Sequence, residues 1–185
     1  MRAVDRLLQR WRIRKAARYI PRGARVLDVG CFDGTLFRLL GGRIAGGLGI
    51  DPLAPEGTLR EGVRLVRGAF PDDMPADAGS FDAITAIAVV EHVPSEAAAG
   101  FARACARYLA PGGRLVLTVP SAGVDAIVRM LQRVRMADGM SLEQHHGLTA
   151  AGAVELFTAH GFQLVRRARF QLGFNNLLVF RKGPQ

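Results

Sequence analysis

Cysteine, lysine and long apolar runs are all scarce in this chain of 185 residues. The two cysteines, Cys31 and Cys105, lie far apart, which argues against a disulfide framework or a zinc site. No run approaches the ~20 apolar residues needed to span a bilayer. The basic N-terminus lacks the apolar segment of a secretory signal. We therefore expect a cytoplasmic protein with no transmembrane segment and no metal site.

Positive charge is concentrated at one end of the chain. The formal net charge is +9, and residues 1–25 hold nine basic residues against one acid, Asp5. Lysine occurs only as Lys15 and Lys182, so a solvated helix face in an arginine-rich protein is the simpler interpretation. The alternative is a patch that attracts a phosphorylated substrate, an anionic membrane or nucleic acid.

The same segment has the apolar spacing of a helix. Apolar residues from Val4 to Ile20 recur at helical intervals between the arginines until Pro21 ends the pattern. We predict a basic N-terminal helix over residues 1–20 that packs on its own domain, with peripheral membrane contact as the alternative.

The remainder alternates short β-like runs with helical segments, so residues 1–185 are treated as one domain. A helix follows Ser95 as its N-cap and ends before Pro111, and another over Thr149–His160 has His160 as its cap. Only three residues join the last two strands, which requires an antiparallel pair. The pattern predicts an α/β fold: a mostly parallel sheet, helices on both faces and a C-terminal antiparallel β-hairpin. The predicted strands are Arg25–Val29, Gly46–Ile50, Val63–Arg67, Phe81–Ala88, Gly113–Val119, Phe162–Phe170 and Phe174–Lys182.

A glycine turn follows the first of these strands, in the stretch VLDVGCFDGTLFRLL. Gly30 and Gly34 allow the backbone to approach a ligand, and the next helix directs its positive end toward it. The second strand ends at Asp51, 23 residues after Asp28, where a carboxylate is placed to accept hydrogen bonds from ribose hydroxyls. A turn and an acid in this context predict an adenosine-containing cofactor.

The spacing of the turn distinguishes between two such cofactors. NAD prefers G-x-G-x-x-G, whereas Gly30 and Gly34 here enclose Phe32 and Asp33. Asp33 would repel a pyrophosphate. A cofactor with no phosphate that carries an ammonium and a sulfonium suits the acids better, and that cofactor is S-adenosylmethionine.

Four segments in order carry a family resemblance. They are Val26–Gly34, Gly49–Asp51, Ser80–Asp82 running to Val90–Val93, and Leu109–Gly113. Together with the terminal hairpin they resemble the motifs of class I S-adenosylmethionine-dependent methyltransferases, from about residue 22 to the end. The chain is most similar to the small bacterial type related to ubiquinone and natural-product methyltransferases. The resemblance implies a Rossmann-like, doubly wound sheet of seven strands.

The resemblance also implies roles for matching residues. The glycine loop would hold the methionine part of the cofactor, Asp51 the ribose, and Pro52 would cover the adenine. Two positions depart from the family pattern: Phe32 replaces a middle glycine, and Ala69 and Phe70 stand where an aspartate usually meets the adenine amine. Asp72, Asp73 or the backbone would replace that contact. The expected cofactor-binding residues are Asp28, Gly30, Cys31, Phe32, Gly34, Asp51, Pro52, Phe70, Ala86 and Ile87.

The residues after the fourth strand narrow the choice of methyl acceptor. Ala86-Ile87-Ala88 replaces the Asn/Asp-Pro-Pro-aromatic motif of enzymes that methylate nucleic-acid or glutamine amines. Methylation at pyrimidine C5 needs a cysteine nucleophile nearby, whereas Cys105 lies inside a predicted helix and is interpreted as a buried apolar residue. What remains is in-line transfer to an oxygen, nitrogen or carbon of a small molecule, and a hydroxyl oxygen is our first choice. No stable nucleic-acid partner is expected.

A hydroxyl acceptor usually needs a base to take its proton, and histidine suits neutral pH. The catalytic candidates are His92, His145 and His146, at most one of the adjacent pair serving as the base. The alternative for each is a structural role that stabilises its own loop.

Residues 121–148 provide room for substrate selection. An apolar helical stripe from Val124 to Val134, followed by Met136 and Met140, predicts a lid over an apolar or anionic acceptor. Three other functions stay open: an RNA methyltransferase with salt-dependent binding, a catalytically silent scaffold that binds the cofactor, and, more distantly, a dehydrogenase.

Overall fold

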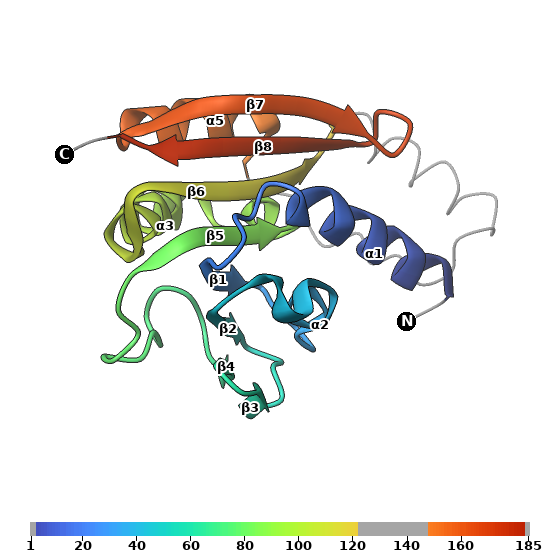
Figure 1. Ribbon diagram of the computed structural model, residues 1–185. Coiled ribbons are helices and arrows are strands. Elements are labelled where there is room, and N and C mark those ends of the chain that lie inside the picture. Colours follow the sequence, from blue (N-terminus) through green and yellow to red (C-terminus); the bar gives the residue numbers. More distant parts are fainter. Residues whose placement is uncertain (1–2, 122–147, 184–185) are drawn as a thin grey trace.

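The computed structural model describes residues 3–121 and 148–183, and these form one eight-stranded sheet with helices on both faces (Figure 1). The strand order is β3-β4-β2-β1-β5-β6-β8-β7. The strands are β1 (Arg25–Val29), β2 (Gly46–Asp51), β3 (Gly57–Arg60), β4 (Val63–Arg67), β5 (Phe81–Ile87), β6 (Leu109–Pro120), β7 (Phe162–Phe170) and β8 (Asn175–Lys182). The helices are α1 (Ala3–Ala17), α2 (Thr35–Leu40), η1 (Gly41–Arg43), η2 (Val90–His92), α3 (Ser95–Tyr108) and α5 (Ala150–Ala159).

The centre of the sheet is parallel. Strands β4, β2, β1, β5 and β6 pair in parallel, and β8 lies antiparallel to both β6 and β7. Strands β1 and β5 are buried over almost their whole length, as expected for strands covered on both faces. The chain builds outward from β1 to β2 and β4, then returns to β5 on the other side. Strand order therefore reverses between β1 and β5, where ligands of open α/β sheets bind at the carboxyl ends.

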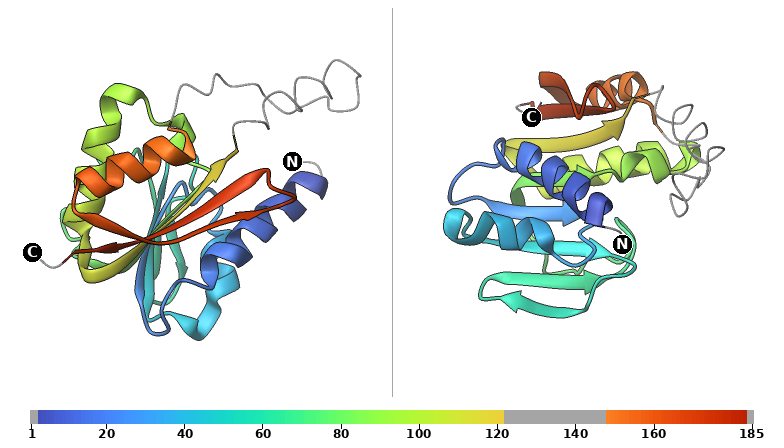
Figure 2. Two further views of the ribbon diagram at one scale, coloured as in Figure 1. Left: turned by 90° about the horizontal axis from the view of Figure 1, so that it is seen from above. Right: turned by 90° about the vertical axis from the view of Figure 1, so that its right-hand side faces the viewer.

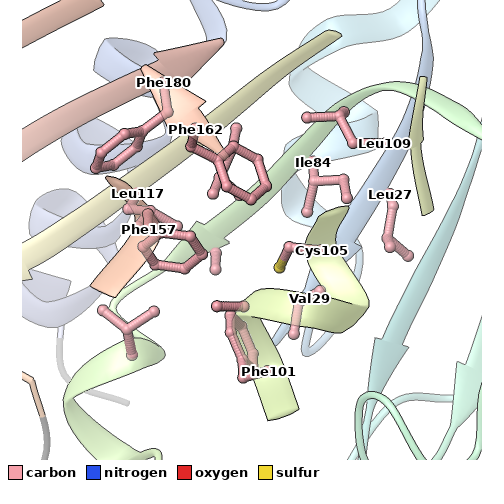
Figure 3. Close-up of a cluster of buried hydrophobic side chains, with 14 of the residues drawn as sticks. Leu27, Val29, Ile84, Phe101, Cys105, Leu109, Leu117, Phe157, Phe162 and Phe180 are labelled. Carbon is pink, nitrogen blue, oxygen red and sulfur yellow. The ribbon is translucent and has the colours of Figure 1, made fainter. Parts of the chain in front are cut away.

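Each face of the sheet has its own apolar core. Helices α1 and α2 cover one face, and α3 and α5 cover the other (Figure 2). Ile13, Ala16 and Ala17 of α1 are buried against the sheet and α2. On the other face, Phe157 of α5 lies 5.5 Å from Phe162 and 5.4 Å from Phe180, measured between ring centroids (Figure 3). These contacts pack helix α5 against the hairpin β7–β8.

The predicted fold is confirmed, with two corrections. The sheet has eight strands and not seven, because Gly57–Arg60 forms an antiparallel edge strand on β4. Pro94 and not Ser95 is the N-cap of α3, and no side chain caps this helix. His160 is confirmed as the C-cap of α5, with its ring Nδ1 2.8 Å from the carbonyl oxygen of Leu156.

Two further expectations concern the ends of elements. Helix α1 ends at Ala17, short of the predicted residue 20, although Ile20 is also buried. Nearly all of the predicted lid, residues 122–147, lies outside the described residues, as do His145 and His146. Within the described part of the chain, no helix is long and apolar enough to cross a membrane.

Candidate functional site

Two cavities adjoin at the carboxyl ends of β1 and β2, and Gly30 lines both. The α1 cavity, about 290 Å³, lies between helix α1 and the turn after β1, and includes Asp28, Cys31 and Ile87 in its wall. The β4 cavity, about 280 Å³, lies beside the Gly68–Asp72 segment that follows β4. This is the place where the reversal of strand order predicts a ligand.

The turn from β1 to α2 brings its backbone close to both cavities. Gly30 and Gly34 have φ angles of +75° and +76°, in the region that favours glycine. The amide of Gly30 donates to the carbonyl oxygen of Ile50 at 2.9 Å, which ties the turn to β2. A Cβ atom at Gly30 would overlap the Cγ2 atom of Val89. Glycine is therefore required here by both conformation and space.

Phe32 keeps the backbone of a glycine. Its φ angle is +46°, although a bulky side chain is uncommon in this region. The side chain is 40% exposed, so the ring has not turned into the core. The substitution of the family's middle glycine therefore leaves the shape of the loop intact.

Asp51 connects the turns after β1 and β2. Its Oδ2 atom accepts the amide of Phe32 at 3.0 Å, and its Oδ1 atom accepts the amide of Leu53 at 2.7 Å. Each carboxylate oxygen has a second lone pair, so both remain able to accept a hydroxyl. The acid is thus fixed at the end of β2 with free acceptor capacity.

Asp28 is a buried acid at the base of the α1 cavity. Its Oδ1 atom accepts a hydrogen bond from the Thr85 hydroxyl at 2.6 Å. Burial raises the pKa of Asp28 to about 7, an effect that the Thr85 hydrogen bond opposes and the nearby Asp51 carboxylate increases. A cation bound beside Asp28 would favour its charged form.

The carboxylate of Asp33 binds to groups at the start of helix α2. Its Oδ1 atom accepts the amide of Thr35 at 3.0 Å and the Thr35 hydroxyl at 2.6 Å. Its other oxygen lies 3.5 Å from Nη1 of Arg38. The acid therefore stabilises the first turn of the helix.

The two cysteines are buried free thiols. Cys31 lines the α1 cavity, and its sulfur packs close to Gly49 of β2. Burial is the main cause that raises the pKa of both thiols. Cys105 is fully buried against the sheet, as expected of an apolar core residue. Neither thiol is activated for nucleophilic attack.

The β4 cavity has an apolar wall and an acid at its rim. Pro52, Phe70 and Asp72 line it, and the Phe70 ring lies edge-on to Phe101 with centroids 5.1 Å apart. The carboxylate of Asp73 instead accepts the amide of Ala69 at 2.8 Å. Of the two acids that could replace the family's aspartate, Asp72 is the one beside the cavity.

The remaining predicted site residues divide between the cavities, the core and the undescribed segment. Ile87 lines the α1 cavity, whereas Ala86 is fully buried and lines neither. His92 lines the β4 cavity, with Pro52 and Phe70. Gly34 lines neither cavity, but begins α2 as its N-cap.

Sequence reasoning missed the contribution of α1. Leu8, Gln9, Arg12 and Ile13 line the α1 cavity. The apolar spacing predicts that this helix packs on the domain, but it does not reveal which surface the helix covers. Val89, which limits the space at Gly30, was missed because it belongs to an apolar run with no distinguishing feature.

The donor set fits S-adenosylmethionine. The close backbone at Gly30 and the Asp28 carboxyl in the α1 cavity suit a cationic amino acid. Asp51 lines neither cavity, but its carboxylate is held at the end of β2 with acceptor capacity for a ribose. The apolar β4 cavity suits an adenine. Among residues 3–121 and 148–183, no three His, Cys, Asp or Glu side chains cluster closely enough to hold a metal ion.

Sequence comparisons identify the family of the chain. A family model described as a methyltransferase domain matches residues 2–167. The chain is 40% identical over 137 residues to a protein named ubiquinone biosynthesis O-methyltransferase from Xanthomonas axonopodis pv. citri, covering 64% of this chain and 56% of the relative. The protein of the same name from Xanthomonas oryzae pv. oryzae is 39% identical with the same coverage. The chain thus spans little more than half the length of these relatives.

Structural comparisons support the fold. Magnesium protoporphyrin IX methyltransferase from Synechocystis, solved with S-adenosylhomocysteine, aligns with a TM-score of 0.73 at 15% identity, covering 99% of this chain and 89% of the other. The N-methyltransferase NodS from Bradyrhizobium japonicum, also with S-adenosylhomocysteine, aligns with a TM-score of 0.67 at 16% identity, covering 98% and 89%. By its family model, its motifs and its fold, this chain belongs to the methyltransferase-domain family.

Proposed function

We propose that this protein methylates a hydroxyl oxygen of a small-molecule acceptor. The observation that carries the proposal is the junction of two cavities at Gly30, with Asp28 in the wall of one cavity and Asp72 in the wall of the other. The similarity at 40% identity to proteins named O-methyltransferase supports oxygen as the acceptor atom. When bound, S-adenosylmethionine supplies a methyl group that is already activated on a cationic sulfur.

Each half of the cofactor has proposed contacts. The turn at Gly30 and the Asp28 carboxyl face the amino-acid end, while Asp51 accepts the ribose hydroxyls. Pro52 and Phe70 enclose the adenine, and Asp72 accepts from its amine. Because transfer from a sulfonium needs mainly alignment, these contacts do most of the catalytic work by positioning.

The acceptor lies, in this proposal, against the α1 cavity. Leu8, Ile13 and Ile87 give that wall an apolar part, while Gln9 and Arg12 add polar groups. Such a wall suits an apolar acceptor that presents one polar end, in agreement with the expectation from residues 121–148.

We assign the base to one of His145 and His146, and not to His92. His92 lines the cavity assigned to the adenine, so it lies on the wrong side of Gly30 to take the acceptor's proton. A neutral histidine would accept that proton as the oxygen–carbon bond forms, and this requires a pH above its pKa, ordinarily about 6.5.

Incubation with labelled S-adenosylmethionine and a panel of phenols and catechols tests this function. We expect an O-methylated product by mass spectrometry, and none with structured RNA. His145→Ala or His146→Ala should lower kcat at least tenfold and remove the fall in rate at acid pH, whereas His92→Ala should raise the KM for the cofactor. Methylation of RNA alone would contradict the proposal, and cofactor binding without turnover would favour the scaffold.

A further inference from the structure

A further cavity lies away from the residues of the candidate cofactor site. It measures about 790 Å³ and is lined by residues where β5, β6 and β7 begin and β8 ends. These strand ends lie toward the left of Figure 1. The loop Pro21–Ala24, Asp82, the bulge before Arg114 and the ends of β7 and β8 enclose the cavity. It shares no lining residue with the α1 or β4 cavity. We call it the arginine cavity.

Strand pairing places two arginines side by side in its wall. Arg114 of β6 pairs with Arg181 of β8, which pairs in turn with Gln163 of β7. All three line the arginine cavity, and Arg22 joins them from the loop after α1. Like charges directly opposite each other on neighbouring strands are destabilising. A bound anion would offset that cost.

Local contacts hold two of these arginines at the cavity. Nη1 of Arg114 donates to the carbonyl oxygen of Tyr19 at 3.1 Å. Arg181 lies over the Gly112 turn, where a Cβ atom would approach its Nη2 atom to 3.6 Å. Gly112 has a φ angle of +73°, so glycine suits this turn in conformation and also leaves room for the guanidinium.

In the described part of the chain, the arginines of this cavity have no carboxylate partner. Within residues 3–121 and 148–183, none of Arg22, Arg114 and Arg181 forms an ion pair. The acid in the wall, Asp82, accepts the backbone amide of Arg25 at 2.8 Å. Three arginines against one carboxylate leave the cavity net positive.

We propose that the arginine cavity binds a phosphate-bearing anion. A guanidinium presents paired N–H donors that match phosphate oxygens, and adjacent arginines suit a ligand with more than one phosphate. The volume lies within the range of small-molecule sites, which favours a soluble phosphorylated compound over the headgroup of an anionic lipid. The proposal does not depend on the methyl acceptor.

Calorimetric titration with inorganic pyrophosphate at low salt tests the site. We expect saturable binding that weakens with added NaCl and falls at least tenfold in R114Q/R181Q. The matched control is R166Q/R167Q, which removes the same charge from exposed positions of β7 outside the cavity and should stay within twofold of wild type. R22Q should weaken binding about threefold. Because Arg22 lies in a loop and not in a strand, this variant still tests the site if R114Q/R181Q misfolds.

Vesicles of phosphatidylcholine with phosphatidylglycerol separate the two phosphate sources. Pyrophosphate binding without vesicle binding assigns the cavity to a soluble ligand, and vesicle binding lost in R114Q/R181Q assigns it to a headgroup. Absence of both, or equal loss in R166Q/R167Q, would overturn the proposal. Titration with S-adenosylhomocysteine should be unchanged in every variant, so failure of this proposal is distinct from failure of the proposed function.

Discussion

At the scale of single residues, two acids define the cofactor site in different ways. Asp51 is held by two backbone amides and is prepared to accept more hydrogen bonds. Asp28 is buried with a single hydroxyl donor, Thr85, and pays a desolvation cost when it ionises. In the proposed site, the first acid accepts the ribose hydroxyls, and the second gains most when a cation binds beside it.

The raised pKa of Asp28 predicts a pH-dependent loss of stability. An unfolded Asp titrates near 3.8 and the folded one at about 7, so the folded state binds the proton more tightly. Its stabilising contribution is complete below pH 4 and is lost as the pH rises through 7. Asp28→Asn keeps an acceptor for Thr85 without this dependence. Between pH 4 and 8, we expect the free energy of unfolding of Asp28→Asn to rise relative to that of wild type by on the order of 4 kcal/mol.

Urea denaturation across that pH range measures the difference. The control is Asp72→Asn, which removes an exposed carboxylate from the same end of the sheet. Its free energy of unfolding should change with pH in the same way as that of wild type. If the difference in free energy of unfolding between wild type and Asp28→Asn stays constant from pH 4 to 8, the raised pKa of Asp28 is refuted.

At the scale of elements, the turn from β1 to α2 determines the site. Three positive φ angles within five residues, at Gly30, Phe32 and Gly34, place the backbone against β2 and the two cavities. The glycines signal this turn in the sequence. Phe32 does not signal the turn, because its side chain does not favour a left-handed backbone. The hydrogen bond from its amide to Asp51 imposes that conformation.

Gly30→Ala should damage both stability and cofactor binding. The new methyl group overlaps Val89 and the residue must keep φ near +75°, which together cost roughly 1–3 kcal/mol. Affinity for S-adenosylhomocysteine should fall at least tenfold. Gly42→Ala, with nothing within 4 Å of its new methyl group, is the control and should behave as wild type.

Val89→Ala provides the second half of a double-mutant cycle. If overlap with Val89 causes the loss of stability, Gly30→Ala should lower the free energy of unfolding less in the Val89→Ala background than in wild type. Additive losses in the two variants would show that the contact at Val89 is not responsible.

Other elements show what local sequence does and does not reveal. Apolar runs identify β1, β2 and β5 because these strands are largely buried. Strand β4 is identified by its alternation of apolar residues with exposed arginines. Strand β3 escapes prediction because Gly57–Arg60 is short, largely polar and paired only at one edge. Ser95 has the chemistry of an N-cap, but the extended backbone of Pro94 precedes the helix and takes that position.

At the scale of the whole molecule, the two ends of the sheet differ in character. Carboxylates and apolar walls gather at the carboxyl ends of β1 and β2, whereas arginines gather where β5 and β6 begin. The candidate cofactor site can be predicted from the sequence because most of its residues fall within short motifs. The arginine cavity cannot, because Arg22, Arg114 and Arg181 are brought together only by the register of β6 and β8 and by the loop after α1. The same limit hid the contribution of helix α1 to the wall of the α1 cavity.

The most direct test of the account is a calorimetric titration of the purified protein with S-adenosylhomocysteine, beside NAD and an Asp51→Ala variant. The structure predicts saturable binding to wild type, no signal with NAD, and at least tenfold weaker binding by Asp51→Ala, which loses the charged acceptor of the ribose hydroxyls. Asp77→Ala, which removes an exposed carboxylate paired with Arg64, is the control and should bind as wild type does. No binding by wild type, or equal binding by Asp51→Ala, would contradict the central claim that the turn at Gly30 and the acid at the end of β2 hold this cofactor.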